Sequence, residues 1–286
     1  MDFSFTEDQQ TIRDAVLAHC ARFPDDYWLE RDNDGVFPHD FHRSMAEAGW
    51  LGLAMPESVG GAGLGMTEAA IMMQAVAESG GGIAAASSIH GPVFSIEVRE
   101  IRKMGRHAVD SNLVFISDLW VPEQDRIGAE GDGFTIILHG LNPERILLGA
   151  EAIGLGRVAI SKAARYARER IVFDRPIGMN QGIQHPLAKC WAQLEADNLM
   201  IMKAATRFDQ GLDCGVEANA GKYLAAEAGF EACHTAMLTL GGMGYAQEYH
   251  VERYLREVLI PRTAPVSPHM ILNFLAEKVL GLPKSY

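Results

Sequence analysis

The feature that most constrains the fold is a run of three long helical patterns in the second half of the chain. Apolar residues recur at helical spacing through residues 134–164, 183–208 and 218–240. Only two short stretches, 178–182 and 210–215, separate these patterns. Long helices with short connections pack antiparallel, because a short loop turns the chain back along the previous helix. With a shorter helical pair at 248–259 and 268–280, the sequence predicts a bundle of four or five helices.

The first ninety residues predict a second group of helices. Thr6-Glu-Asp-Gln9 is a capping box, in which the Thr6 hydroxyl and the Gln9 side chain each accept from a backbone donor at a helix start. Residues 28–40 are polar and contain Gly and Pro, so we expect a loop there. Further helices are predicted at 41–48, 66–78 and 83–90.

Between the two helical regions the sequence has a short β-like stretch. Residues 96–99 alternate apolar and polar side chains, and residues 113–116 form an apolar run. Two or three strands are not stable as an isolated sheet and need a helix to cover them. We therefore predict a mainly α fold, with an amino-terminal helical domain at 1–94, a β region at 95–128 and a carboxy-terminal helical bundle at 129–286.

Composition narrows the functional classes. The chain has 286 residues, with 25 Lys and Arg against 37 Asp and Glu, and a net charge of −12. Nucleic acid and anionic lipid would be repelled at long range. The four cysteines form no CxxC pair, so we expect buried free thiols and no metal site. With no signal or transit pattern and no long apolar run, the sequence predicts a cytoplasmic or mitochondrial-matrix protein without a membrane span.

Two glycine pairs could suggest a dinucleotide-binding loop. They are Gly61-Ala-Gly63 and Gly154-Leu-Gly156. Such a loop must follow a strand and open a helix within a βαβ unit, and neither pair has that context. We expect Gly154 and Gly156 to allow close packing of helices instead.

Glu144 is the strongest candidate for a catalytic residue. Most glutamates are solvated surface charges. However, Leu141, Ile146, Leu147 and Leu148 leave little polar surface around this one. Apolar surroundings raise the pKa of a carboxyl group, which suits it to proton abstraction. We therefore predict that Glu144 is a general base.

Three segments together resemble the acyl-CoA dehydrogenase family. They are Gly140-Leu-Asn-Pro-Glu-Arg145, Arg170-Ile-Val-Phe-Asp-Arg175 and Leu240-Gly-Gly-Met-Gly-Tyr245. Residues 3–90 resemble the amino-terminal helical domain of that family. Residues from 103 onward resemble the end of its middle β-domain and its carboxy-terminal bundle. Roughly a hundred residues, the size of a small domain, are missing between His90 and Ser95. The β region at 95–128 is thus a remnant of the middle domain.

The resemblance implies an FAD-dependent oxidoreductase of fatty acid β-oxidation. It would convert an acyl-CoA thioester to the 2-enoyl-CoA and pass electrons to an electron-transfer flavoprotein. Most members take their base from a position near the carboxy terminus, where this chain has Ala264-Pro-Val-Ser267. Isovaleryl- and long-chain-type members instead place it one residue before an Arg on an earlier helix, where Glu144 stands. Glu151, two turns further on, is the fallback base, and Asn142 and Arg145 match positions that hold the acyl-CoA.

The resemblance also implies a set of cofactor contacts. Arg170, Phe173 and Gln181 would contact the FAD of a neighbouring subunit, so a homodimer or homotetramer is expected. Gly241 and Gly242 would approach the FAD pyrophosphate. Taken without the resemblance, these glycines could simply end a helix. Two other functions stay open: a catalytically inactive chain that acts only through oligomer or protein association, and a flavin oxidase or monooxygenase of the same fold.

Overall fold

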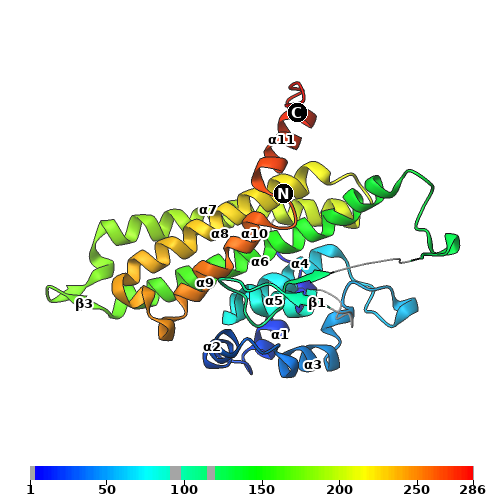
Figure 1. Ribbon diagram of the computed structural model, residues 1–286. Helices are drawn as coiled ribbons and strands as arrows, with labels where there is room; N and C mark the ends of the chain where they lie inside the picture. Colours follow the sequence, from blue (N-terminus) through cyan, green and yellow to red (C-terminus); the bar gives the residue numbers. More distant parts are fainter. Residues whose placement is uncertain (1–3, 91–97, 115–119, 286) are drawn as a thin grey trace.

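Three long helices lie side by side and form the body of the protein (Figure 1). The structure is a computed structural model that describes residues 4–90, 98–114 and 120–285. The long helices are α6 (Gly133–Glu169), α7 (Gln181–Asp209) and α8 (Gly215–Leu240), followed by α9 (Val251–Glu257), α10 (Leu259–Thr263) and α11 (Pro268–Lys278). The predicted mainly α fold is confirmed. Helix α11 projects away from the body.

Small residues let α6 and α8 approach each other closely. The face of α8 toward the core is rich in alanine, including Ala218, Ala225 and Ala232, which pack against Ile146 and Ile153 of α6. A methyl group at Gly229 would lie 2.7 Å from the Ala152 carbonyl oxygen. The axis-to-axis separation of packed helices depends on the side chains at the contact, so this alanine and glycine face brings the two backbones together.

The amino-terminal residues form a second helical layer below the bundle in Figure 1. Its helices are α1 (Glu7–Cys20), α2 (Asp25–Asp34), α3 (His39–Glu47), α4 (Met66–Val76) and α5 (Gly82–His90), with 3-10 turns at Trp50–Gly52 and Glu57–Val59 and a π-helical turn at Ala77–Gly81. The predicted capping box is present. The Gln9 amide donates to Thr6 Oγ1 at 3.2 Å, and the Thr6 amide donates to Gln9 Oε1 at 3.1 Å.

Gly154 and Gly156 lie where α6 meets its neighbours. A methyl group at Gly154 would stand 2.2 Å from the Gln74 carbonyl oxygen of α4, and one at Gly156 would stand 2.7 Å from a Leu194 methyl carbon of α7. Both approaches are closer than atoms can pack. The prediction that these glycines permit close helix packing is confirmed.

The loop predicted at residues 28–40 was wrong for its first half, because α2 extends to Asp34. Trp28 anchors this helix: its side chain is 2% exposed and its ring centroid lies 5.0 Å from that of Phe41. Gly35, with φ of 67°, ends it. A helix that packs through two neighbouring aromatic residues, with mostly charged residues elsewhere, shows little hydrophobic periodicity.

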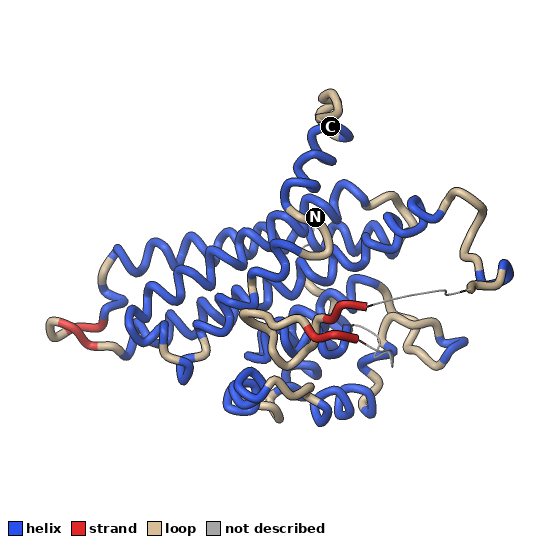
Figure 2. The backbone as a smooth tube through the Cα atoms, in the orientation of Figure 1, coloured by secondary structure: helices blue, strands red, loops and turns tan. Residues whose placement is uncertain are grey.

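Strands occur only as two short antiparallel hairpins in the described part of the chain (Figure 2). The first pairs β1 (Val98–Glu100) with β2 (Asn112–Val114) in the predicted β region. Residues 96–97 and 115–116 of the expected strands lie outside the described residues. The second pairs β3 (Ile171–Val172) with β4 (Arg175–Pro176), and we did not predict it. Four further 3-10 turns are Glu123–Asp125, Ile177–Met179, Gly241–Tyr245 and Gln247–Tyr249.

A buried ion pair ties α9 to the amino-terminal layer. Arg253 and Glu257 form an ion pair at 3.1 Å, and both are almost completely buried. Arg253 Nη2 also donates to the Gly80 carbonyl at 2.6 Å, and Glu257 Oε2 accepts from the Ala84 amide at 3.0 Å. Helix α9 is thereby fixed to the turn between α4 and α5.

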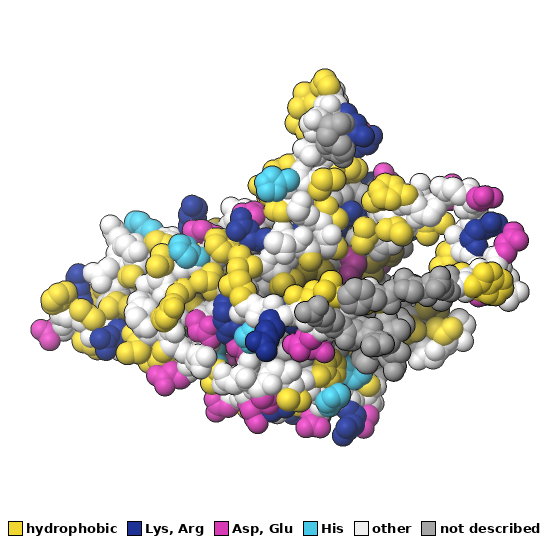
Figure 3. Space-filling model, viewed as in Figure 1, with side chains coloured by type: hydrophobic (Ala, Val, Ile, Leu, Met, Phe, Trp, Pro, Cys, Tyr) yellow, Lys and Arg dark blue, Asp and Glu magenta, His cyan; other side chains and the backbone are white. Residues whose placement is uncertain are grey.

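The thiols and the surface charges follow the composition. Cys20, Cys190, Cys214 and Cys233 are all buried and free, as predicted. Figure 3 shows acidic side chains over the amino-terminal helices and hydrophobic side chains along the bundle. Within residues 4–90, 98–114 and 120–285, no helix combines the length and apolar character needed to cross a bilayer.

Candidate active site

A cavity of about 620 Å³ lies beside α6, between α5, the β region and the connection from α10 to α11. The residues of its wall that matter for chemistry are Arg106, Asp110, Glu144, Glu151, Ala264 and Pro265. The cavity therefore collects side chains from four separate parts of the chain. Its charged groups are three carboxylates and one guanidinium.

Glu144 and Glu151 both face this cavity from α6. Residues seven apart in a helix lie two turns apart on one face. Glu144 is half-buried toward the amino-terminal end of α6, whereas Glu151 is almost completely buried. Leu147 and Leu148 separate the two carboxylates along the wall. The structure thus brings the predicted base and the fallback base together.

The connection between α10 and α11 supplies another wall of the same cavity. Ala264 and Pro265 line it, together with Ile260 of α10. This is the segment in which we expected, from the sequence, the base of most members of the resembled family. Glu144 and this segment therefore face one space, and Ala264 and Pro265 bring no carboxylate to it.

Arg106 is a cavity residue that the sequence reasoning missed. It lies in the turn-rich stretch between β1 and β2, with φ of 55°. Its guanidinium donates to Ser87 Oγ at 3.1 Å and to Ser111 Oγ at 3.2 Å. Burial lowers the pKa of Arg106, and the Glu151 carboxylate acts against that shift. Only packing of the β region against α5 and α6 reveals this residue, because no local pattern distinguishes it from a surface arginine.

Arg145 does not line the cavity that contains Glu144. It is buried within the bundle, where its Nη1 donates to Asn142 Oδ1 at 3.0 Å. Burial lowers the pKa of Arg145. Asn142 lines a different cavity of about 430 Å³, with Phe208 and Cys214. Consecutive helical residues point in different directions, so the two predicted substrate contacts face away from the predicted base.

The predicted cofactor contacts lie at the opposite end of α6. Arg170 and Gln181 are exposed, and Phe173 is 94% exposed at the tip of the β3–β4 hairpin. A methyl group at Gly241 or Gly242 would meet no atom within 4 Å, so their backbone can be approached from solvent. Because α6, α7 and α8 alternate in direction, the end of α6, the start of α7 and the end of α8 meet there (Figure 1).

Two groups of predicted site residues are therefore separated along one helix. The path from Glu144 to the carboxy-terminal end of α6 is about 37 Å at the usual rise per residue. The base and its cavity lie toward one end of the bundle, and the predicted FAD contacts lie at the other. One chain does not bring these two groups into a single site.

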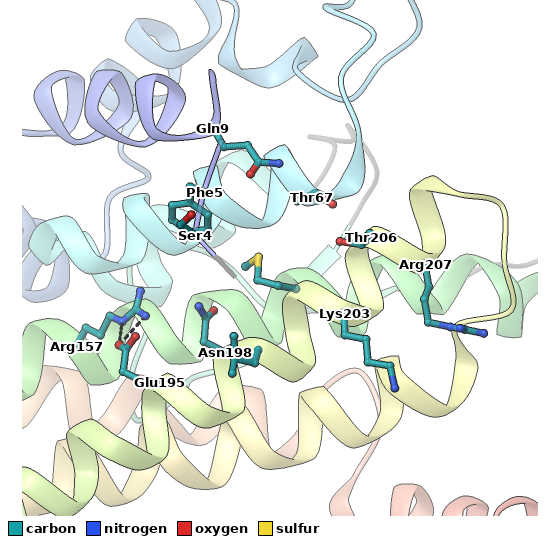
Figure 4. A pocket seen from close by; sticks show the side chains of 12 residues that line it. Ser4, Phe5, Gln9, Thr67, Arg157, Glu195, Asn198, Lys203, Thr206 and Arg207 are labelled. Atoms are coloured by element: carbon teal, nitrogen blue, oxygen red, sulfur yellow. Dashed lines mark hydrogen bonds and ion pairs between the residues drawn. The ribbon is translucent and has the colours of Figure 1, made fainter. Parts of the chain in front are cut away.

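A further cavity of about 520 Å³ lies between α1, α4, α6 and α7 (Figure 4). Arg157 and Glu195 form an ion pair across it at 2.7 Å, and Lys203 and Arg207 extend from α7. None of the predicted site residues lines this cavity. In the part of the chain that the structure describes, no group of three or more His, Cys, Asp or Glu could hold a metal ion.

Two models of known protein families match the chain. The model of the acyl-CoA dehydrogenase carboxy-terminal domain matches residues 131–278, and that of the amino-terminal domain matches residues 6–111. The chain belongs to the acyl-CoA dehydrogenase family. The described residues of both matched ranges are mainly helical, and the chain lacks the middle β-domain of this family.

Known members of this family are longer than the chain. Acyl-CoA dehydrogenase FadE12 of Mycobacterium tuberculosis (strain ATCC 25618 / H37Rv) is 28% identical over 386 aligned positions that cover the whole of both proteins. Because this chain has 286 residues, 386 minus 286 leaves 100 aligned positions with no residue in it. The family fold is thus present without a segment of domain size.

Solved structures match the fold closely. The glutaryl-coenzyme A dehydrogenase complex with glutaryl-CoA has a TM-score of 0.88 at 21% identity, covering 100% of this chain and 98% of that one. The FAD complex of PigA has a TM-score of 0.87 at 18% identity, covering 98% and 99%. At these identities the similarity establishes the fold.

Proposed function

We propose that this acyl-CoA dehydrogenase family member converts an acyl-CoA thioester to the 2-enoyl-CoA, with Glu144 as the base and FAD as the cofactor. The observation that supports this most directly is the cavity that Glu144 shares with Ala264 and Pro265. Two alternative positions for the base in the family face one space here. A carboxylate at either position would face the same substrate, and of these two positions this chain has one only at Glu144.

The residues around Glu144 suit proton abstraction from the carbon next to the thioester. The Glu144 carboxylate would take the α-proton, while Leu147, Leu148 and Ile260 provide apolar walls that limit water. Holding the α-carbon against a fixed base removes much of the entropic barrier of the reaction. Arg106 adds a positive charge to the wall of the cavity. FAD, when bound, would accept the β-hydride.

The chain fits FAD in part. Arg170, Phe173 and Gln181 and the open backbone of Gly241 and Gly242 would hold its nucleotide half. In residues 4–90, 98–114 and 120–285 the strands form only two hairpins, and neither offers a sheet to hold the flavin ring. Because these contacts lie far from Glu144 along α6, we infer a homodimer or homotetramer in which they serve a neighbouring chain. We retain the division into domains at 1–94, 95–128 and 129–286 as part of this proposal.

The test is the visible spectrum of the purified protein incubated with excess FAD. Bound flavin that bleaches when acyl-CoA is added is the expected result. Glu144→Gln should bind the flavin and abolish the bleaching, while Glu151→Gln should retain it. Bleaching that persists at the wild-type rate in Glu144→Gln would assign the base to another residue. An electron-transfer flavoprotein is the expected acceptor, and rapid reoxidation by air alone would favour the oxidase or monooxygenase.

One observation favours an association function without catalysis. Large apolar side chains are exposed near the missing middle domain, including Trp120, Ile127, Phe134 and Ile137. Contiguous exposed apolar surface promotes protein association. A stable oligomer that binds no flavin, even with FAD in excess, would support this function and exclude the dehydrogenase.

A further inference from the structure

Lys222 is a buried cation that forms no ion pair with a described residue. Its side chain on α8 is 1% exposed, and its Nζ donates to the Val266 carbonyl oxygen at 2.7 Å. None of the ion pairs between described residues includes Lys222. A buried charge that lacks an ion pair costs free energy, because it has lost its hydration. The amine therefore destabilises the folded state. Its hydrogen bond to the Val266 carbonyl offsets part of that cost.

The charged neighbours of Lys222 increase this cost. On α6, the buried Arg145 guanidinium is a neighbouring positive charge. Burial of the amine and, second to it, the charge of Arg145 lower the pKa of Lys222 to about 8. On α8 itself, Glu227 acts in the opposite direction, but its carboxylate is held by Arg262 at 2.8 and 3.0 Å. The α10–α11 connection contributes the Val266 carbonyl, which accepts the hydrogen bond from Lys222.

Val266 directly follows the cavity wall formed by Ala264 and Pro265. The connection has no regular secondary structure from Ala264 to Ser267. The Ala264 amide bonds back to the Ile260 carbonyl at 2.9 Å, and Ser267 caps α11 by accepting from Met270 at 3.4 Å. Between those two anchors, the Lys222 bond is what joins the connection to the bundle.

We propose that Lys222 is a positioning residue, which holds the Ala264–Pro265 wall of the acyl-CoA cavity in place through the Val266 carbonyl. This inference rests on the proposed function, because it takes the cavity beside Glu144 as the acyl-CoA site. Lys222 touches neither the cavity nor the reacting atoms. It acts on the substrate only through the wall.

The bond should weaken when Lys222 loses its proton. A hydrogen bond from an ammonium group is about twice as strong as one from a neutral amine. The guanidinium groups of Arg145 and Arg262 keep their charge at alkaline pH. Acyl-CoA binding should therefore weaken as the pH rises past about 8, the pKa of Lys222.

The experiment compares Lys222→Met with Lys189→Met, which removes an exposed lysine from α7. The first readout needs no ligand: amide hydrogen exchange of residues 266–271 should be faster in Lys222→Met than in the wild type or the control. The second is calorimetric binding of an octanoyl-CoA whose β-carbon is replaced by sulfur, so that it cannot be dehydrogenated. Wild-type affinity should fall about fivefold from neutral to alkaline pH, the difference between charged and neutral hydrogen bonds.

The two variants should differ in both affinity and pH profile. Lys222→Met should bind weakly at every pH, and Lys189→Met should follow the wild type. Wild-type affinity and wild-type exchange in Lys222→Met would overturn the inference. If Lys222→Met does not fold, Lys222→Gln keeps a neutral N–H donor, and its binding should be independent of pH. A wild type that binds no acyl-CoA would reject the proposed function, while the exchange comparison would still decide the role of Lys222.

Discussion

Glu144 of α6 and Pro265 of the α10–α11 connection line the same cavity, although they are far apart in the sequence. Because the two residues share a cavity, we expect that the catalytic carboxylate can be moved from position 144 to position 265. Glu144→Ala should lower the dehydrogenation rate by about 10²- to 10⁴-fold, the usual contribution of a general base. Adding Pro265→Glu to that variant should raise its dehydrogenation rate at least about tenfold, because the new carboxylate would face the same substrate carbon.

Acyl-CoA-dependent reduction of an artificial electron acceptor by the FAD-loaded enzyme measures this recovery. The matched control is Pro265→Gln in the Glu144→Ala background, which changes the wall without adding a base. Equal rates in the two double variants would show that the cavity does not present both positions to one substrate.

The buried pair of Arg253 and Glu257 should be a major source of stability. Arg253→Met leaves the Glu257 carboxylate buried without its partner and removes the bond to Gly80. Breaking one side of a buried pair costs about 3–5 kcal/mol in the free energy of unfolding. Urea denaturation measures the loss. Arg43→Ala is the control, because Arg43 and Asp40 form an exposed pair at 3.8 Å. A loss as small as that of Arg43→Ala would contradict the assignment.

Gly154→Ala should destabilise the protein by about 2 kcal/mol or more, because the added methyl overlaps the Gln74 carbonyl of α4. Gly140→Ala is matched to it on the same helix, where a methyl group meets no atom within 4 Å. That change should stabilise the helix by about 0.5–1 kcal/mol, since alanine loses less entropy than glycine. Thermal unfolding of both variants tests the pair, and similar melting temperatures would contradict close packing at Gly154.

Phe173 should contribute to flavin binding and not to stability. It has φ of 51° and its side chain is almost fully exposed, a strained arrangement for a bulky residue that packs against nothing. Phe173→Gly should leave the melting temperature unchanged or higher and lower the amount of FAD bound. Asp174→Gly relieves similar strain at φ of 61° but keeps the ring. Equal FAD binding in the two variants would mean that the aromatic ring makes no contact with the cofactor.

Lys222→Met should stabilise the protein near neutral pH, by about 1–3 kcal/mol, because it replaces an unpaired buried charge with an apolar side chain of similar volume. The pKa of Lys222 falls from 10.5 to about 8 on folding. Between these two values the unfolded chain binds more protons, so wild-type stability rises with pH. The advantage of the variant should therefore shrink over that range. Urea denaturation at several pH values measures it, and a constant or growing advantage would contradict the buried, unpaired amine.

Local sequence patterns were sufficient to predict the long helices. They were insufficient where one or two residues determine the local structure. Helix α6 repeats its apolar residues over many turns, so its type was predictable. The β3–β4 hairpin was not, because Phe173 and Asp174 adopt left-handed conformations that usually mark glycine or asparagine. Arg106 and Lys222 were missed for a related reason. A charged residue is solvated in most sequences, and only its distant neighbours reveal that it is buried.

The sequence by itself determined the mainly α fold, the family and the position of Glu144 in it, because helical periodicity and short motifs depend on residues close together in the chain. Only the tertiary structure decided that Glu144, Glu151 and Pro265 face one cavity, while Arg145 turns into the bundle beside Lys222. Adjacent residues of a helix point about 100° apart, so a small rotation of α6 selects which of them meets the cavity. That rotation is set by the glycine and alanine contacts of α6 with α4 and α8.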